Sequence, residues 1–432
     1  MRKIIHITHN DGDAVGCDVL VRLMGHFYRY KEIESHFCNV NAASEELNKV
    51  LDNIDGKEID LENKIDAVII SDISVNEETL NRLEVLSKTY QFDIFGCDHH
   101  ATNHADENHK WFYVIPEASY EDESQPVYNN FVPISATLLL YYVFRNIRVV
   151  GKHNDEIVKI NTMPLDIFTI SDSAKEFLST PTLMQIFYQI SDYDVYNFKY
   201  YPHEYKFKYY GDDETCPLES EACIVPEVTK LIGPERTSDL LYDHIVNFIS
   251  YVRPMRNTNV YPYEFKDFIS IIMRRKNGVL KDIRKKLVPA KVKVPIIADN
   301  TTIERDVLMV LMSGPDSNSV ADFMYNNIPE YTDIWFLFAE TRNISFRSSS
   351  DVINWGDFAK LLGGGGHPKA SGANNILPLD FLELIKYVYT HPSYEELLTM
   401  DNNPEMVRHR VYDVIEFNKN ENGDYRITVS KE

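Results

Sequence analysis

Residues 92–100 read FDIFGCDHH, and this stretch decides the fold of the 432-residue chain. The apolar letters from Phe92 to Phe95 are typical of a short buried strand. Asp98, His99 and His100 follow directly, where that strand is expected to end. Chemistry in α/β proteins lies just outside the carboxyl ends of strands. A surface turn with polar residues would read the same, so the rest of the chain has to decide.

The segments around this stretch alternate between strand and helix patterns. Such alternation predicts a doubly wound, mainly parallel sheet with helices on both faces. Strands are expected at 3–8, 33–40, 67–71 and 92–97, and helices at 14–30, 44–51 with Ser44 as its cap, and 76–90. Beyond them we expect an acidic loop at 117–124, helices at 135–146 and 182–190, an irregular insertion at 196–226, and helices at 235–251 and 265–287.

From Lys291 the pattern changes to short strands and helices, which predicts a second, smaller α/β domain. The expected strands are 292–298, 307–312, 334–339 and 343–347, with a helix near 319–326. We therefore expect a first domain at 1–230, a helical linker or insertion at 231–288, and a second domain with a C-terminal tail at 289–432.

The amino-acid composition limits the binding partners and the compartment that we expect for this chain. With 44 Lys and Arg against 66 Asp and Glu, the net charge is -22, which argues against a long nucleic-acid duplex because phosphates need clustered cations. Five cysteines without a Cys-x-x-Cys spacing indicate neither a disulfide framework nor a zinc knuckle, and favour the cytoplasm. No apolar run approaches the roughly 20 residues of a membrane span. We expect a soluble, unprocessed protein.

Polar residues also follow the first expected strand. His9, Asp11 and Asp13 stand at alternate positions, so their side chains project to one side of an extended segment. Gly12 lets the backbone turn tightly between the two acids. An ordinary Asp/Gly turn would not need three potential ligands at this spacing.

Asp72 follows the third expected strand and should emerge at the same rim as His9 and Asp98. A single aspartate there is most often a helix cap. Together, however, the three strand ends supply closely packed carboxylates that would repel one another without cations. Imidazole and carboxylate ligands without thiolate favour Mn²⁺ over structural zinc. Two ions sharing one carboxylate is the arrangement used for in-line displacement at phosphorus.

These residues, taken in order, resemble the motifs of DHH phosphoesterases that carry a DHHA1 domain. The motifs are THNDGD at 8–13, SDI at 71–73, DHH at 98–100 and GGGGHPKASG at 363–372. The pattern is most similar to nanoRNase B-type oligoribonucleases, with SATL at 135–138 and YDVY at 193–196. The resemblance implies a DHH catalytic domain at 1–230 and a DHHA1 substrate-binding domain at 289–432.

The resemblance also implies two Mn²⁺ ions, for which Mg²⁺ or Co²⁺ could substitute. His9 and Asp11 would bind one ion, Asp13 and His99 the other, and Asp72 would bridge them. Because consecutive residues rarely point at one metal, His100 would either support the metal ligands from behind or contact the substrate phosphate.

Asp194 best matches the aspartate that completes the second metal in this family. Tyr196 stands where similar proteins often have Trp, and Asp172 is the reserve candidate. Asp98 would orient the neighbouring imidazoles, as carboxylates behind metal ligands commonly do.

The glycine run of the second domain is the other substrate contact. Its backbone amides could approach a phosphate closely, and a helix starting beyond them would add its positive end. By resemblance, this loop and Arg347 grip the terminal nucleotide or phosphate. The expected substrate-binding residues are His100, Arg347, Gly364, Gly365, Gly366 and His367. A glycine run usually indicates a flexible linker, but the HPKASG that follows this one is not typical of a plain linker.

One dense basic run remains. It is either a solvated helix face or a region that attracts substrate phosphates. Its members are Arg274, Arg275, Lys276, Lys281, Arg284, Lys285, Lys286, Lys291 and Lys293.

The sequence therefore predicts a two-metal phosphodiesterase that hydrolyses short oligonucleotides to nucleoside monophosphates. Two alternatives stay open: a phosphatase or phosphodiesterase acting on 3'-phosphoadenosine 5'-phosphate or on cyclic or linear dinucleotides, and an inactive nucleotide-binding regulator. A homodimer also stays open.

Overall fold

The structure is a computed structural model, and the part of the chain that it describes has gaps. It describes residues 3–27, 32–55, 64–101, 103–120, 131–145, 147, 149–153, 156–160, 172–195, 209, 216–250, 260–296, 301–312, 317–374, 376–401, 403–404, 407, 413–420 and 425–431. The chain forms two compact units, Met1–Met273 and Arg274–Glu432. The finer division into domain, linker and second domain stays a prediction.

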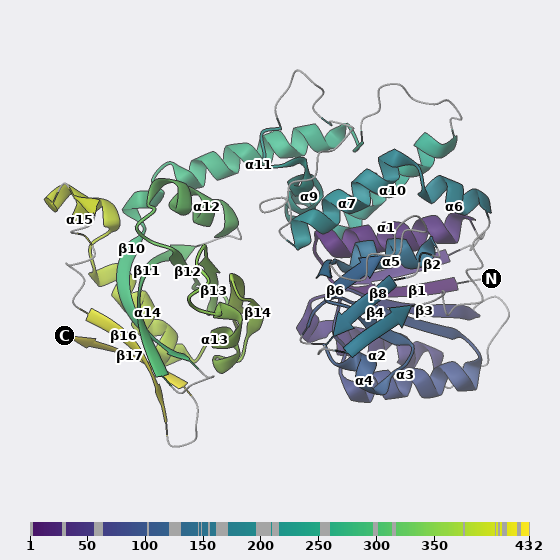
Figure 1. The fold of residues 1–432 in the computed structure, drawn as a ribbon, viewed down its shortest axis with the longest axis horizontal. Helices are drawn as coiled ribbons and strands as arrows, with labels where there is room; N and C mark the ends of the chain where they lie inside the picture. The colour runs from purple at the N-terminus through teal and green to yellow at the C-terminus, as the bar shows by residue number, and fades with distance from the viewer. Residues whose placement is uncertain are drawn as a thin grey trace. The chain divides into compact units, whose positions relative to one another are not determined.

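A five-stranded parallel sheet forms the centre of the first unit, as the sequence predicts (Figure 1). Its strand order is β2-β1-β3-β4-β5, and neighbouring strands all run parallel. The strands are β1 (Lys3–Thr8), β2 (Glu32–Phe37), β3 (Ile65–Ser71), β4 (Asp93–Asp98) and β5 (Phe112–Val114). The strand order reverses direction between β1 and β3, which makes this the switch point of the sheet.

Alternation along the strands sends apolar side chains to both faces of the sheet. Ile4 and Ile69 belong to one buried cluster, whereas Ile5 and Ile70 belong to another. The first cluster packs under α1 (Gly12–Phe27), α5 (Ala136–Phe144), α7 (Pro181–Asp194), α9 (Ile224–Ile232) and α10 (Pro234–Ser250). The second packs under α2 (Ala43–Ile54) and α3 (Glu77–Tyr90), with the short α4 (Ala105–Asn108). A doubly wound fold is thereby confirmed.

Helix caps explain two starts and correct one expectation. Asn76 accepts a hydrogen bond from the Thr79 amide at the start of α3, and Ser135 does the same for α5. Ser44 is not the cap of α2, because that helix begins at Ala43, and the Ser44 hydroxyl instead accepts from the Asn76 amide at 2.9 Å.

One further expectation about the first unit is wrong. Glu117–Tyr120, expected in a loop, is the strand β6 of a small antiparallel sheet with the order β7-β6-β8-β9. Its other strands are β7 (Val132–Pro133), β8 (Val149–His153) and β9 (Glu156–Ile160). The expected irregular insertion lies mostly outside the described residues, and α9 begins at Ile224, near the expected end of the insertion. Pro226 is tolerated there because the first turn of a helix needs no amide donor.

The second unit contains a mixed eight-stranded sheet with the order β14-β15-β13-β12-β11-β10-β16-β17. These strands are β10 (Val288–Ile296), β11 (Thr301–Met312), β12 (Asp333–Phe338), β13 (Asn343–Ser348), β14 (Gly365–His367), β15 (Ala370–Ala373), β16 (Asp413–Lys419) and β17 (Tyr425–Lys431). Its helices are α12 (Ser317–Asn327), α13 (Trp355–Leu361), α14 (Pro378–Thr390) and α15 (Tyr394–Asp401). α11 (Glu264–Leu280) contains the boundary between the units, and α6 (Asp172–Leu178) belongs to the first. Among the described residues, none of the helices is both long and apolar enough to cross a membrane.

The contact between α1 and α5 predicts a large effect of one added methyl group. A Cβ at Gly16 would lie 2.2 Å from Thr137 Oγ1, which is itself held by a 2.6 Å hydrogen bond to the Asp13 carbonyl. Gly16→Ala should lower the free energy of unfolding by about 1–3 kcal/mol. Gly278→Ala is the control, since its Cβ would meet nothing within 4 Å, and it should raise stability by about 0.5–1 kcal/mol. Urea unfolding measures both, and a neutral Gly16→Ala would contradict this packing.

Candidate active site at the carboxyl ends of the parallel strands

Three adjacent strand ends deliver the polar side chains. β1, β3 and β4 end at Thr8, Ser71 and Asp98, so His9, Asp72 and His99 leave the sheet side by side. His9 and Asp72 flank the switch point between β1 and β3, where doubly wound sheets bind their ligands.

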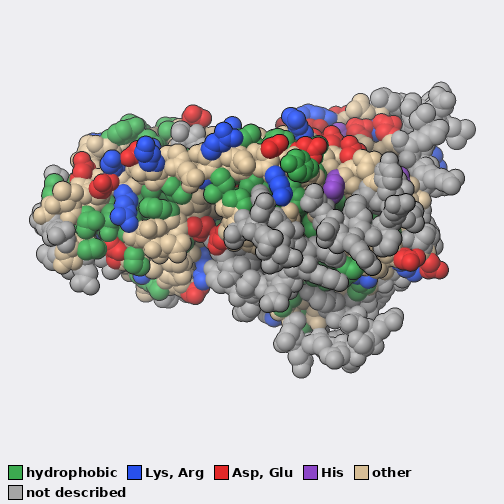
Figure 2. All heavy atoms as spheres, turned by 90° about the horizontal axis from the view of Figure 1, so that it is seen from above, with side chains coloured by type: hydrophobic (Ala, Val, Ile, Leu, Met, Phe, Trp, Pro, Cys, Tyr) green, Lys and Arg blue, Asp and Glu red, His purple; other side chains and the backbone are tan. Residues whose placement is uncertain are grey.

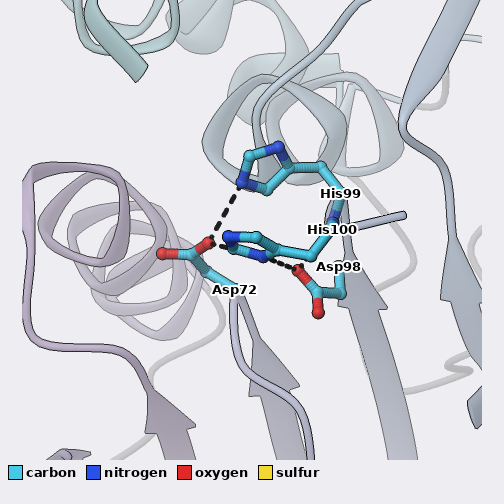
Figure 3. Close-up of side chains that lie close together, drawn as sticks. All are labelled: Asp72, Asp98, His99 and His100. Carbon is cyan, nitrogen blue, oxygen red and sulfur yellow. Dashed lines mark hydrogen bonds and ion pairs between the residues drawn. The ribbon is translucent and has the colours of Figure 1, made fainter. Parts of the chain in front are cut away.

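His99 lies at the centre of the cluster. Its Nε2 is 3.4 Å from Asp72 Oδ1, 3.2 Å from Asp194 Oδ2 and 4.0 Å from Asp13 Oδ2. Figure 3 shows the rings of His99 and His100 lying close together, both directed toward Asp72. Helix α7 ends at Asp194 and so brings a fourth segment to the strand ends.

Ligand atoms gather in three groups among the described residues, each within 4.8 Å. His9, Asp11 and Asp72 form one group, and Asp13, His99 and Asp194 form a second. The third consists of Asp72, Asp98, His99 and His100. The structure thus brings together all six residues expected to bind metal, although their assignment as ligands stays a prediction.

Asp72 is the least compensated of these acids. It is 1% exposed, and its Oδ2 accepts no hydrogen bond in the described part of the chain. Burial, followed by the charges of Asp11, Asp13 and Asp194, raises the pKa of the Asp72 carboxyl well above its usual range. Its φ of +56° lies in the left-handed region, which is uncommon for residues other than glycine. A divalent cation fits this site, because it would neutralise the crowded carboxylates and occupy the orphaned oxygen.

The start of α1 stabilises the charge of Asp11. Asp11 Oδ1 accepts hydrogen bonds from the amides of Asp13 and Ala14 at 3.0 and 3.1 Å, and Oδ2 lies 2.8 Å from His9 Nδ1. Burial opposes ionisation, but the hydrogen bond and charge of His9 outweigh it and lower the Asp11 pKa.

The start of α5 holds Asp13 in the same way. Asp13 Oδ2 accepts from the Ala136 amide at 2.8 Å, and Oδ1 accepts from the Thr137 amide at 3.1 Å. Burial and the charge of Asp11 nevertheless raise the pKa of Asp13 to about 6. The SATL motif therefore contributes helix amides that fix a carboxylate.

Asp98 holds His100 and the turn after β4. Its Oδ1 accepts from the His99 amide at 2.7 Å and lies 2.8 Å from His100 Nδ1, while Oδ2 accepts from Asn103 Nδ2 at 2.7 Å. Burial opposes both charges, but the charge attraction and hydrogen bond between the two side chains outweigh it. The pKa of Asp98 therefore falls to about 2 and that of His100 rises to about 9. The Asp98 oxygens are committed to hydrogen bonds, and the His100 side chain remains 40% exposed.

The two candidates for the last ligand differ clearly in position. Asp194 lies in the cluster, and burial with the charges of Asp13 and Asp11 raises the pKa of its carboxyl well above the usual range. Asp172 is the first residue of α6, is fully exposed, and lies 3.9 Å from Lys175. The structure brings Asp194, and not Asp172, to the other acids.

In the second unit, Arg347 and part of the glycine run line an open pocket of about 360 Å³. The glycine residues in its lining are Gly365, Gly366 and Gly372, whereas Gly364 and His367 lie outside it. A Cβ at Gly364 would lie 2.0 Å from the Gly372 carbonyl oxygen, so this glycine serves close packing.

No helix starts after the glycine run, contrary to expectation. The run instead ends α13, where Gly363 at φ +77° donates to the Lys360 carbonyl and Gly364 donates to that of Ala359. These two bonds form a Schellman motif. The chain then enters the β14–β15 hairpin, so the positive end of a helix is not available to a phosphate there.

Several cations of the basic run have acidic partners. Lys285 lies 3.0 Å from Asp282, and Lys293 lies 2.7 Å from Glu416. On the face that Figure 2 shows, described Lys and Arg side chains are scattered among acidic and apolar ones. Attraction of substrate by this run stays a prediction.

Sequence reasoning missed a buried polar network beneath the site. His6 and Asp18 are at most 1% exposed, and they lie 3.1 Å apart between Nδ1 and Oδ1. His6 Nε2 lies 2.8 Å from the hydroxyl of Ser71, the residue before Asp72. The available signal was a histidine in the middle of an apolar strand.

Sequence comparison confirms the resemblance to the DHH phosphoesterases. The curated relative is oligoribonuclease NrnB of Bacillus subtilis (strain 168), with 31% identity over 141 residues. The match spans 32% of this chain and only 30% of that protein. No family model matches the chain.

Two solved structures show weak overall likeness. RecJ in complex with Mn²⁺ from Thermus thermophilus has a TM-score of 0.43 and 12% identity, covering 96% of this chain and 59% of that one. The pGpG-specific phosphodiesterase PggH from Vibrio cholerae has a TM-score of 0.38 and 11% identity, covering 90% and 100%. Both TM-scores are below 0.5.

The crowded carboxylates make the effect of Mn²⁺ on stability depend on pH. Because the Asp13 pKa is raised to about 6, the folded protein without metal holds this proton more tightly than the unfolded chain does. Its stability therefore falls as pH rises from about 3.9, the unfolded value, to about 6. A cation must displace that proton, so saturating Mn²⁺ should raise Tm more at pH 8 than at pH 5. Thermal unfolding measures this, and equal shifts at both pH values would contradict it.

Proposed function

We propose that this protein is a two-metal phosphodiesterase that hydrolyses short oligonucleotides to nucleoside monophosphates. The observation that carries the proposal is the pair of ligand groups on either side of Asp72, His9 with Asp11 and Asp13 with His99 and Asp194. Asp72 would bridge two Mn²⁺ ions, with Mg²⁺ or Co²⁺ as substitutes. When bound, such ions supply an activated water and polarise a phosphoryl oxygen.

The remaining site residues would bind and orient the phosphate. Asp98 keeps His100 protonated at neutral pH, because the pKa of that imidazole is raised to about 9. The exposed ring of His100 could then donate a hydrogen bond to a phosphate oxygen beside Asp72. Asp98 would act through His100, to which its Oδ1 is hydrogen-bonded.

Arg347 supports a second phosphate or nucleotide contact in the second unit. Its guanidinium donates only to neutral acceptors, including Asn318 Oδ1 at 2.9 Å and Ser345 Oγ at 2.7 Å. In the described part of the chain it makes no ion pair, so its charge is available to an anion in the pocket. Planar bidentate recognition of phosphate is the property in which arginine exceeds lysine.

The net charge of the chain and the similarity to an oligoribonuclease both support short substrates. The net charge of -22 disfavours long nucleic acid, and the relative NrnB is named an oligoribonuclease. The five cysteines are free, which supports a reducing cytoplasm.

The direct test is Mn²⁺-dependent cleavage of labelled RNA and DNA of two to five nucleotides. A parallel panel contains dinucleotides and 3'-phosphoadenosine 5'-phosphate, which separates the alternative substrates. If every compound stays intact with Mn²⁺ present, the proposal fails, and tight nucleotide binding without turnover would identify a regulator.

Asp72→Asn should abolish turnover while leaving the chain folded. The loss should exceed the roughly 100-fold that removing an outer partner of a metal ligand costs, because Asp72 would hold both ions. Single-turnover cleavage measures it. Asp172→Asn is the matched control and should be silent, since Asp172 is exposed at the start of α6. Near-normal activity of Asp72→Asn would contradict the proposed site.

Arg347→Lys should raise KM about 10-fold and change kcat little. Lysine keeps the charge but loses the fork that grips a phosphate, which is worth about one or two hydrogen bonds to a charged group. Steady-state kinetics on a dinucleotide measures both constants. Arg236→Lys, exposed in the first turn of α10 and outside the basic run, is the control. An unchanged KM for Arg347→Lys would place substrate binding elsewhere.

A further inference from the structure

A buried hydrogen-bond network around His6 links β1 and α1 to Ser71, the residue before Asp72. His6 is in the middle of β1, and its ring lies between Asp18 of α1 and Ser71 at the end of β3. Thr8 adds a second link, because its hydroxyl donates to the Ser71 carbonyl at 2.9 Å and lies 3.1 Å from the Ser71 hydroxyl. The last residue of β3 is thus held through both its side chain and its backbone.

The chemistry of a carboxylate decides which group is the donor in the hydrogen bond between His6 and Asp18. An ionised carboxylate only accepts hydrogen bonds, so His6 donates to Asp18 through Nδ1 and keeps Nε2 for the Ser71 hydroxyl. The ring therefore has one orientation that satisfies both neighbours. Such an arrangement resembles the way a carboxylate orients a histidine behind a metal site.

Asp18 is itself fully supplied with donors. The hydroxyls of Ser35 on β2 and Ser238 on α10 both donate to it, and Arg22 lies 3.8 Å away. Burial would raise the Asp18 pKa, but the hydrogen bonds of His6, Ser238 and Ser35 lower it overall. A buried charge with this many partners is rigid, because moving it would leave several groups unsatisfied.

Asp72, by contrast, has little to hold its own side chain. One carboxylate oxygen accepts no hydrogen bond within the described residues, and the other lies 3.4 Å from His99 Nε2. Its backbone adopts φ +56°, with the amide donating to the Cys97 carbonyl at 3.0 Å. The direction of the carboxylate consequently depends on the backbone at the end of β3. Unfavourable backbone conformations persist only when their surroundings over-determine them.

We propose that His6 is a positioning residue that, through Ser71, holds the end of β3 in the conformation that presents Asp72 to the two cations. The proposal rests on the proposed function, since it assigns Asp72 the bridging role. His6 touches neither substrate nor cation. Its effect is to pre-organise a ligand whose Oδ2 accepts no hydrogen bond from any of the described residues.

Direct Mn²⁺ binding to the full chain tests this proposal. Ser71→Ala removes the hydroxyl between His6 and Asp72, and His6→Asn removes the ring nitrogen that reaches it. Each should raise the Kd for Mn²⁺ about 10-fold, the lower end of what losing an outer partner of a metal ligand costs. The number of ions bound per chain should not change. kcat on a dinucleotide should fall while KM stays the same.

Thr237→Ala is the matched control. Thr237 is also fully buried, stands next to Ser238 on α10, and donates to the Gly233 carbonyl at 2.7 Å without joining the network. It should leave the Kd for Mn²⁺ unchanged. A variant that is only partly folded would instead bind fewer ions per chain at an unchanged Kd, which separates misfolding from mispositioning.

Each outcome decides one question. If the parent protein binds no Mn²⁺, the proposed function itself fails. If the parent binds Mn²⁺ and Ser71→Ala binds it within about twofold, only the positioning role is overturned. Equal weakening by Ser71→Ala and Thr237→Ala would also overturn it, because the effect would then be general. Should His6→Asn not fold, Ser71→Ala alone decides.

Discussion

Mutual repulsion among crowded carboxylates is the constraint that the rest of the first unit has to satisfy. Asp11, Asp13, Asp72 and Asp194 lie close together, and the charges of Asp11, Asp13 and Asp194 each raise the cost of ionising at least one of the other acids. The fold offsets part of this cost with the positive ends of two helices, α1 at Asp11 and α5 at Asp13. One oxygen of Asp72 accepts no hydrogen bond among the described residues, and a divalent cation would compensate its charge.

The parallel topology explains why these acids meet at all. Parallel strands present all their carboxyl ends at one edge, and the strand order places β1, β3 and β4 side by side there. The first strand then continues into α1 on one face, and the chain returns through α2 on the other. Doubly wound sheets bind their ligands at such a reversal, where neighbouring connections leave to opposite faces. The strand order therefore determines where Asp72 lies, because it places the end of β3 between the ends of β1 and β4.

Local patterns predicted the parts of the fold that depend on local physics. The four long strands of the parallel sheet were readable from apolar runs, and their polar followers from the rule that such strands end at one edge. The antiparallel sheet was missed because β6 carries Glu117 and Ser119, which read as a loop, and because its pairing with β8 joins residues distant in sequence. The turn after α13 was misjudged because a glycine run can end one helix as readily as begin another. The SATL motif was recognised, but its contact with Asp13 spans more than a hundred residues and left no periodic signal. His6 was not singled out, because nothing local in the sequence identifies Asp18 as its partner.

The hydrogen bond from Ser238 to Asp18 joins residues 220 positions apart in the chain. During synthesis, β1, α1 and β2 emerge long before α10, and Asp18 would then have to be buried with one of its donors missing. The loop that this contact closes is long, so the chain loses conformational entropy in closing it before the contact can stabilise the fold. Domains of this size commonly populate intermediates. The α1 face of the sheet is accordingly expected to consolidate late, with the cation site completed only after α10 has docked. Cells that make this protein would gain the site as one of the last events of folding.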